Sequence, residues 1–243
     1  MEEQVNRLVD KTWAKFQTIP PNQRLMIAIS GIPGSGKTTL ARTITARLNA
    51  LSSSTSPPGR ASEIATFIPM DGYHLPLSAL HAMPDPVHAL ARRGAPFTFD
   101  GPAYLSLVAS LRPPLTPSTP TVYAPSFSHT TKDPVADGIR IGKESRVLVF
   151  EGNYLSLDEG VWGDAGQLMD EHWFVDVEAE VARRRLVERH VRSGVAGSRE
   201  EAERRAREND LVNGREIVEK RRKGISELVV SREDQGWKAV GEE

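Results

Sequence analysis

Residues 31–38 read Gly-Ile-Pro-Gly-Ser-Gly-Lys-Thr, which is a complete GxxxxGK[ST] phosphate-binding loop. An apolar run precedes it and a helical pattern follows it, as the motif requires. In such a loop the glycines turn backbone N–H groups toward phosphates, the lysine reaches the β- and γ-oxygens, and the final hydroxyl holds Mg²⁺. The sequence therefore predicts a bound nucleoside triphosphate, with Thr38 also a magnesium ligand and with contacts from Gly31, Gly34, Ser35, Gly36, Lys37, Thr38 and Thr39.

Two carboxylates stand where further apolar runs end. Asp71 follows the run at 64–68, and Glu151 closes the run at 147–150. Both are expected at strand tips that flank the phosphate-binding loop. There Asp71 would take the proton of an attacking hydroxyl or order magnesium-bound water, and Glu151 would bind Mg²⁺ directly or through water. The alternative for Asp71 is a purely structural role at the start of a turn.

A basic segment at 178–192 carries five arginines and is followed by two glycines. Arg185 and Arg189 lie four residues apart and therefore share one helical face. Such a face resembles a mobile lid whose guanidinium groups offset the charge of a transferring phosphoryl group. Both are candidate catalytic residues, whereas Arg183 and Arg184 are expected to belong to a solvated face paired with glutamates.

The composition limits the classes of partner. The chain has 243 residues, a formal net charge of -1 and no cysteine, so disulfides and thiolate chemistry are excluded. The balanced charge gives no indication of nucleic acid or a membrane as partner. No apolar stretch approaches the roughly 20 residues that span a bilayer, and the first residues are acidic. We expect a cytoplasmic monomer or homodimer with a small-molecule partner.

Strand-length apolar runs alternate with helical patterns, which predicts an α/β P-loop NTPase fold. Its three layers comprise a five-stranded parallel sheet covered by helices on both faces, with runs at 25–29, 64–68, 147–150, 173–175 and 228–230. We expect one domain over 1–243, with an N-terminal helix at 1–20, a substrate-binding insertion at 71–145 and an arginine-bearing lid at 183–200.

A phosphate-binding loop alone does not distinguish a kinase from a GTPase, a transporter ATPase or a helicase. The sequence contains neither an NKxD guanine motif nor an LSGGQ-like signature, and it is too short for a two-lobed motor. Together with Asp71 and the basic segment, these absences favour a kinase. A non-catalytic ATP-binding regulatory module is the alternative from another class.

The segments GIPGSGKTT, MDGYH, RRGAPFTFDGPAY, VLVFEGNYL and FVDVEAEVARRRLVERHVRSG resemble the uridine kinase, phosphoribulokinase and pantothenate kinase family of P-loop kinases. The resemblance covers roughly residues 25–230. The stretch Arg92–Asp100, with Asp133–Val135 further on, looks most like a branch of fructose-type sugar kinases and fungal uridine-kinase-like proteins. By this resemblance Asp71 matches the catalytic carboxylate, Glu151 the Walker B acid, and Arg185 and Arg189 the lid arginines.

The resemblance also implies substrate contacts. Phe99–Ala103 is similar to an FDxPxA segment whose aspartate holds sugar hydroxyls, although Asp100 could instead cap a helix at 101–111. The segment 127–129 looks like the YSH of pantothenate kinases, so His129 is expected to touch substrate. The full set of expected substrate contacts is Asp71, Tyr73, His74, Arg93, Asp100, His129, Asn153 and Tyr154, of which Asn153 and Tyr154 could equally be loop structure.

One departure from the family bears on specificity. Uridine kinases carry a Tyr-Asp pair where this sequence has Phe127-Ser128, and a site built to hydrogen-bond a polar group rejects analogues by about 10⁴-fold. The sequence therefore predicts ATP- and Mg²⁺-dependent phosphorylation of a hydroxyl on a sugar or sugar-like alcohol, with a nucleoside or pantothenate-like vitamin as the alternative acceptor. Asn209, Asn213 and Arg215 lie beyond the lid, where contacts with the adenine base could form, but we expect them on a helix surface.

Overall fold

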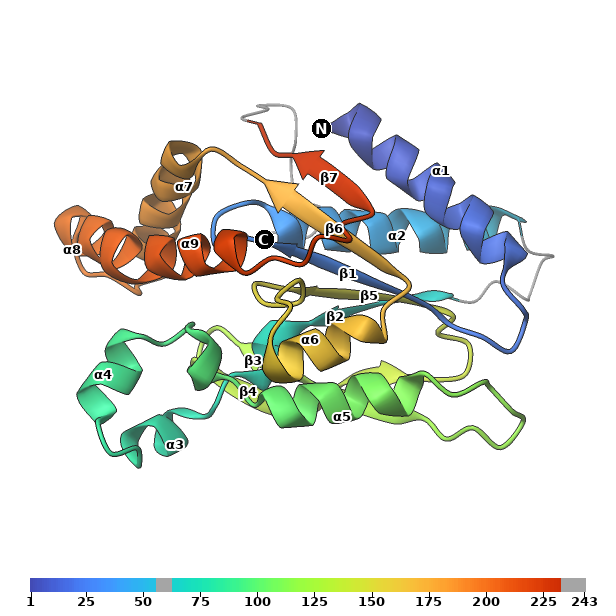
Figure 1. Ribbon diagram of the computed structural model, residues 1–243, viewed down its shortest axis with the longest axis horizontal. Helices are drawn as coiled ribbons and strands as arrows, with labels where there is room; N and C mark the ends of the chain where they lie inside the picture. The colour runs from blue at the N-terminus through green and yellow to red at the C-terminus, as the bar shows by residue number, and fades with distance from the viewer. Residues whose placement is uncertain (56–62, 233–243) are drawn as a thin grey trace.

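The computed structural model describes residues 1–55 and 63–232, with a five-stranded parallel sheet at its centre (Figure 1). The strand order is β2-β5-β1-β6-β7, which confirms the predicted fold class. The strands are β1 Leu25–Gly31, β2 Ala65–Pro69, β5 Val147–Gly152, β6 Glu171–Asp176 and β7 Glu227–Val230.

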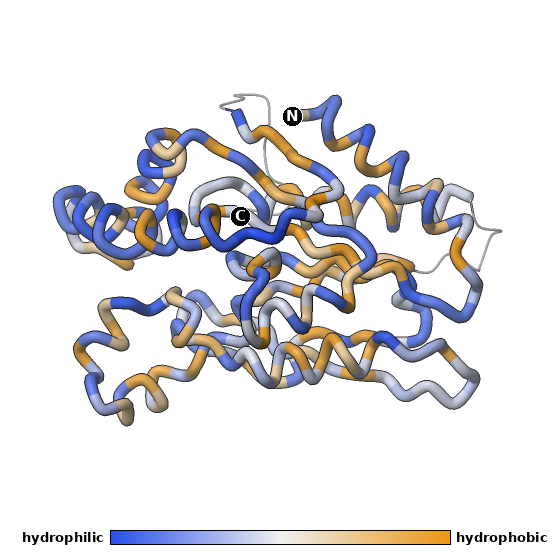
Figure 2. The backbone as a smooth tube through the Cα atoms, viewed as in Figure 1, coloured by the Kyte–Doolittle hydropathy of each residue, from blue (hydrophilic) through white to orange (hydrophobic). Residues whose placement is uncertain are grey.

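The central strands are apolar without interruption because both faces of the sheet are covered. Every residue of β1 and of β5 is buried. Side chains alternate between the faces, so Met26 and Ala28 enter one hydrophobic cluster while Ile27 and Ile29 enter the other. Figure 2 shows these strands as a hydrophobic centre within more polar helices.

Helices form the two outer layers (Figure 1). On one face, α1 (Glu2–Thr18) and α2 (Lys37–Thr55) bury Leu8, Ile44 and their neighbours. On the other face, α5 (Gly101–Leu111) and α6 (Gly160–Gln167) bury Tyr104 and Trp162. Within residues 1–55 and 63–232, no helix is both long and apolar enough to span a bilayer.

The segment between β2 and β5 carries other elements besides α5, and its residues Ala124 and Ile141 join the same core cluster as Ala28. It contains a second, antiparallel sheet, made by β3 (Val122–Ser128) and β4 (Asp133–Ile141), which the sequence analysis did not predict. Prolines at 125 and 134 and a register shift between Ala124 and Ser126 obscure its alternation. The other elements are η1 Met70–Tyr73, α3 Leu77–His81, α4 Pro86–Ala91 and η2 Pro96–Thr98.

The chain between β6 and β7 is mostly helical, and its helices lie at one end of the molecule (Figure 1). Its elements are α7 Ala179–Arg192, α8 Arg199–Arg205, the π-helical turn η3 Ala206–Asp210 and α9 Leu211–Glu219. The Ser198 hydroxyl accepts a hydrogen bond from the Glu201 N–H at 3.1 Å and so begins α8. Leu186 and Ala202 belong to a small cluster that holds α7 and α8 together.

Candidate active site

The loop between β1 and α2 has the geometry of an anion cradle. Gly34 and Gly36 adopt φ values of +81° and +87°, which favour glycine, and the Ser35 N–H donates to the Ile32 carbonyl at 3.1 Å. The Ser35 hydroxyl is buried and has no hydrogen-bond partner in the described part of the chain. Because α2 begins at Lys37, its N-terminus faces this loop. The loop therefore fits a triphosphate.

Lys37 and Glu151 form a buried pair beside the loop. The Lys37 Nζ lies 3.9 Å from Glu151 Oε1, and both side chains are at least 89% buried. Burial raises the pKa of Glu151 to about 7, although Lys37 and a hydrogen bond with the Thr38 side chain act in the opposite direction. Burial also lowers the pKa of Lys37. The structure thus brings together Lys37, Thr38 and Glu151, as a magnesium–phosphate site requires.

Asp71 lies at the same edge of the sheet, in η1 directly after β2. Its side chain is 52% exposed, and its negative charge acts on both Lys37 and Glu151. The Nδ1 atom of His74 lies 2.9 Å from the Asp71 carbonyl and 3.8 Å from the Asp71 carboxylate. Asp71 therefore combines access to solvent with proximity to the phosphate-binding residues.

His74 sits within a small aromatic group. Its ring centroid lies 4.1 Å from that of Phe99 and 5.0 Å from that of Phe127. His129 packs edge-on against Phe127 at 5.4 Å, and the Arg93 guanidinium lies 5.8 Å from the centre of the Phe127 ring. Burial, with the neighbouring Arg93 and His129, lowers the pKa of His74. The structure therefore gathers His74, Arg93 and His129 around Phe127.

Asp100 begins α5, and its carboxylate accepts a hydrogen bond from the Ala103 N–H at 2.9 Å. It is also exposed and lines a cavity of about 600 Å³, together with Tyr73 and His74. The helix-capping role that the sequence left open is therefore present. Asp100 thus caps the helix and lines the cavity at the same time.

Tyr154 and Asn153 follow β5 but differ in exposure. Tyr154 is fully buried, and its hydroxyl donates to the Gly94 carbonyl at 2.6 Å. Gly94 has φ +104°, so this bond holds a sharp turn of the chain that carries Arg93. Asn153 is half-buried. The contacts of Tyr154 are those of a residue that positions the turn at Arg93.

The two arginines that the sequence analysis assigned to a lid have different surroundings. Arg185 donates to the Gly34 carbonyl at 3.3 Å, to the Ser231 hydroxyl at 2.9 Å and to the Arg232 carbonyl at 3.0 Å. It therefore fastens α7 to the phosphate-binding loop. Arg189 is exposed and makes no hydrogen bond or ion pair within the described ranges, while its charge lowers the pKa of Lys37. Arg183 instead pairs with Glu180 and Glu203, as expected for a solvated face.

Two asparagines expected on a helix surface are buried, so that prediction was wrong. Asn209 and Asn213 are 4% and 1% exposed. The Asn209 amide donates to the Arg93 carbonyl at 3.0 Å, and the Arg92 guanidinium donates to the Asn213 side-chain oxygen at 2.6 Å. The π-helical turn of η3 turns Asn209 inward, and nothing in the sequence pattern indicates this turn. Both asparagines couple the helices after β6 to the insertion.

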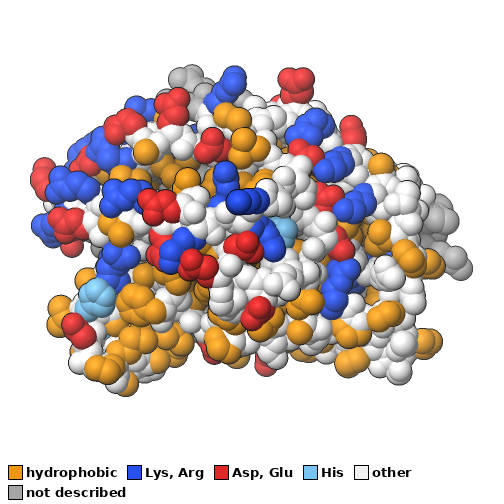
Figure 3. All heavy atoms as spheres, viewed as in Figure 1, with side chains coloured by type: hydrophobic (Ala, Val, Ile, Leu, Met, Phe, Trp, Pro, Cys, Tyr) orange, Lys and Arg blue, Asp and Glu red, His pale blue; other side chains and the backbone are white. Residues whose placement is uncertain are grey.

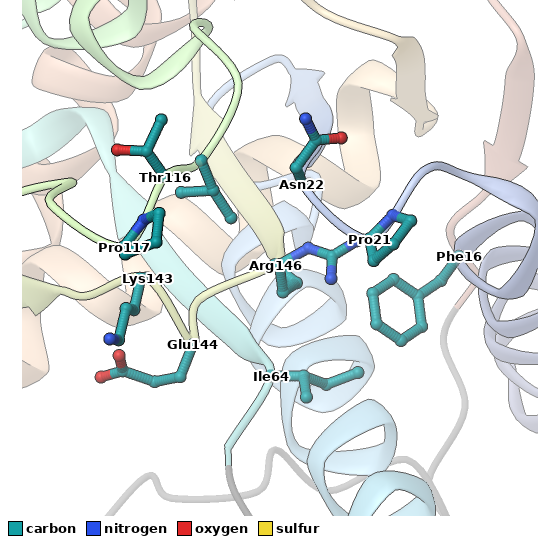
Figure 4. Close-up of a pocket in the computed structure, with 10 residues that line it drawn as sticks. Phe16, Pro21, Asn22, Ile64, Thr116, Pro117, Lys143, Glu144 and Arg146 are labelled. Carbon is teal, nitrogen blue, oxygen red and sulfur yellow. The ribbon is translucent and has the colours of Figure 1, made fainter.

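A further cavity of about 490 Å³ lies away from the phosphate-binding loop, near the amino ends of β2 and β5 (Figure 4). It is lined by Phe16, Ile64, Thr116 and Arg146, among others, and the Arg146 guanidinium lies 5.4 Å from the centre of the Phe16 ring. None of the predicted site residues lines it. The site is therefore at the carboxyl ends of the strands.

The phosphate-binding loop, the Lys37–Glu151 pair and Asp71 on a parallel sheet define the class of P-loop kinases. The chain shares 52% identity over 160 residues with an ATP-dependent kinase-like protein of Aspergillus versicolor, covering 66% of this chain and 92% of that protein. A protein of Schizosaccharomyces pombe, named as a candidate uridine kinase, is 40% identical over 79% of this chain and 77% of its own length. The chain belongs to this family of uridine-kinase-like P-loop kinases.

Solved structures agree with this assignment. A candidate fructose transport system kinase from Silicibacter sp. TM1040 superposes with a TM-score of 0.76 at 31% identity, over 92% of this chain and 98% of that one. YFH7 from Saccharomyces cerevisiae, a P-loop kinase with a circular permutation, superposes with a TM-score of 0.79 over 95% and 99%, and at 21% identity it shows the fold alone. No protein-family model matches the chain.

Proposed function

We propose that this protein transfers the γ-phosphoryl group of ATP to a hydroxyl of a small polar metabolite, with a sugar or sugar-like alcohol as acceptor. The observation that carries the proposal is the position of Asp71, half-exposed beside the buried Lys37–Glu151 pair. A module that only binds ATP has no need of an open carboxylate at this point. The family assignment supports a phosphotransferase.

The phosphate-binding loop would hold the triphosphate. Backbone N–H groups from Gly34 to Thr38 face the phosphates, and Lys37 neutralises the β- and γ-oxygens. The Thr38 hydroxyl and the Glu151 carboxylate would hold Mg²⁺, which when bound supplies charge neutralisation between the phosphates. The buried, unpartnered hydroxyl of Ser35 supports the same assignment.

Asp71 would accept the proton of the acceptor hydroxyl as the new O–P bond forms and the bond to ADP breaks. Arg189 has no carboxylate partner in the described part of the chain and would offset the negative charge on the transferring group. Arg185 would support the same charge while it keeps α7 on the loop. His74, Arg93, Asp100 and His129 would bind the acceptor.

The names of relatives point to different acceptors. A sugar is supported by the structural match to a candidate fructose transport system kinase at 31% identity. A nucleoside is the second candidate, because the Schizosaccharomyces pombe relative is named as a candidate uridine kinase. The location in the cytoplasm and the monomeric or homodimeric state expected from the sequence are parts of the same proposal.

The variant Asp71→Asn tests the function directly. ADP release is measured with Mg²⁺-ATP across free sugars, sugar acids, sugar phosphates, nucleosides and pantothenate, and ATP binding is measured in parallel with a fluorescent analogue. We expect one acceptor class to stimulate the wild type and kcat to fall by about 10²- to 10⁴-fold in the variant, with ATP affinity retained. The variant Asp10→Asn, at an exposed position of α1, is the control. Unchanged turnover in Asp71→Asn would overturn the assignment.

A further inference from the structure

Three arginines lie close to the acceptor side of the site. Arg92 and Arg93 follow α4, and Arg205 ends α8. The bonds of Asn209 to the Arg93 carbonyl and of Asn213 to Arg92 bring the two segments together. Figure 3 shows that charged side chains of both signs crowd over α7–α9, whereas the layer of α3–α5 is mostly apolar. The bonds of the two asparagines join the segment of Arg92 and Arg93 to the helices after β6.

These arginines have few anionic partners. Arg93 lies 3.3 Å from Asp133, whose carboxylate also accepts the Leu77 N–H at 2.8 Å. Within residues 1–55 and 63–232, the Arg92 side chain bonds only the neutral side chain of Asn213, and the Arg205 side chain makes no hydrogen bond or ion pair. Of the two carboxylates of η3, Asp210 lies 2.9 Å from His190 and Glu208 pairs with Arg207. Of the three guanidinium groups, only that of Arg93 contacts a carboxylate within the described residues.

The Nε atoms of Arg92, Arg93 and Arg205 are buried and have no hydrogen-bond partner in the part of the chain that the structure describes. A buried donor on a charged group is costly when it is left unsatisfied. Burial and the neighbouring charge of Arg205 lower the pKa of Arg93, against the effect of Asp133, so the two guanidinium groups repel each other. An anion bound by the terminal nitrogens of both guanidinium groups would remove the repulsion.

This group of arginines connects to the site of phosphoryl transfer. The Arg93 guanidinium lies over Phe127, and Phe127 packs on His74, whose Nδ1 is 2.9 Å from the Asp71 carbonyl. The charge of Asp71 also acts on Arg93. A small acceptor whose hydroxyl meets Asp71 can therefore present its opposite end to Arg93 and Arg205.

We propose that the acceptor carries an anionic group, a carboxylate or a phosphate monoester, which Arg93 and Arg205 bind. The substrate class is then a sugar acid or a sugar phosphate and not a free sugar. This inference rests on the proposed kinase function, because only a phosphotransferase has an acceptor. The anion site itself is a property of the protein that can be tested without turnover.

The first experiment measures anion binding with the phosphate-binding loop already filled. The protein is saturated with Mg²⁺ and a non-hydrolysable ATP analogue and is then titrated calorimetrically with inorganic phosphate and, separately, with acetate. We expect affinity for at least one of these anions to fall about 10- to 100-fold in Arg205→Gln and to be partly restored in Arg205→Lys. Arg207→Gln, at a 74%-exposed side chain in η3, is the matched control and should bind like wild type. Equal binding by wild type and Arg205→Gln would overturn the site.

The second experiment compares matched acceptors. Each neutral polyol or sugar is tested beside its carboxylate and its phosphate monoester, and the ADP-release kinetics give kcat and KM. We expect an anionic member to exceed its neutral partner about 10- to 100-fold in kcat/KM, with Arg205→Gln raising KM for that member alone. The better member of the pair distinguishes carboxylate from phosphate.

The outcomes separate the two proposals. If a neutral sugar has the same kcat/KM as its anionic partners, and Arg205→Gln has the kinetic constants of the wild type, the proposal of an anionic acceptor is overturned while the kinase function stands. Anion binding that depends on Arg205, without stimulation by any acceptor, would uphold the anion site and overturn the proposed kinase function.

Discussion

Glu151 shows how burial sets the chemistry of a single residue. It is 5% exposed at the end of β5, opposite Ile29 of β1, and burial raises its pKa to about 7 against the effect of Lys37. Folding therefore favours the protonated carboxyl relative to the unfolded chain. The stabilisation from this group is complete below the unfolded value of about 4.5 and is lost as pH rises through about 7.

A pH-dependent stability follows at this residue. The difference in unfolding free energy between wild type and Glu151→Gln is expected to change by about 1–3 kcal/mol between pH 4.5 and 8, because only the wild type loses this stabilisation. Urea unfolding of both proteins in the absence of nucleotide, at several pH values, measures the difference. The exposed Glu188→Gln should parallel the wild type at every pH. A constant difference for Glu151→Gln would show that its pKa is not raised in the folded protein.

At the scale of elements, the contact between η1 and β3 determines where Asp71 lies. A Cβ atom on Gly72 would fall far inside van der Waals contact of the Pro125 carbonyl oxygen, so only glycine permits this approach. The backbone that carries Asp71 is thus packed directly on the hairpin of β3 and β4. The hairpin of β3 and β4 therefore helps to position Asp71, which lies directly after β2 of the five-stranded sheet.

Gly72→Ala should therefore disturb both stability and turnover. The added methyl group must push η1 away from β3, so we expect a loss of about 2–4 kcal/mol in unfolding free energy and a fall in kcat larger than the change in KM for ATP. Gly224→Ala is the control, because nothing lies within 4 Å of its Cβ position. Denaturant unfolding and ADP-release kinetics measure the two effects. Wild-type stability in Gly72→Ala would show that the hairpin yields without cost.

At the scale of the whole molecule, α1 near one end of the chain contacts β6 and, near the other end, β7. Lys11 and Lys15 contact the Glu171 carboxylate at 3.3 Å and 2.6 Å, and the Trp173 indole N–H donates to it at 3.1 Å. Gln4 exchanges two hydrogen bonds of 3.0 Å with the backbone of Val230 in β7. Residues near both ends of the described chain therefore lie side by side. This adjacency is compatible with the same fold in the circularly permuted YFH7.

Removal of this anchor is expected to lower stability without reaching the site. Glu171→Ala leaves the two lysines and the indole N–H without their shared acceptor, which should cost about 2–3 kcal/mol in unfolding free energy. KM for ATP should stay unchanged, because Glu171 lies at the amino end of β6. Glu2→Ala removes the surface pair with Arg47 and should cost less than about 1 kcal/mol. Equal losses in the two variants would contradict a special role for the buried carboxylate.

The sequence alone determined the sheet, the phosphate-binding loop and the placement of Asp71 and Glu151 at one edge. Each of these depends on a short apolar run and the residues next to it, so local pattern suffices. The hairpin of β3 and β4 escaped prediction because prolines interrupt its alternation.

Only the tertiary structure decided how the residues proposed to bind the acceptor are arranged. Asn209 bonds the Arg93 carbonyl across 116 residues, and Tyr154 bonds Gly94 across 60, so no local pattern marks either contact. That the Arg205 Nε lacks a partner in the described part of the chain is known only from the folded structure, which shows where the nearby carboxylates lie. Whether a charged side chain is paired or left to bind a ligand depends on the residues near it in space, and only folding brings those residues together.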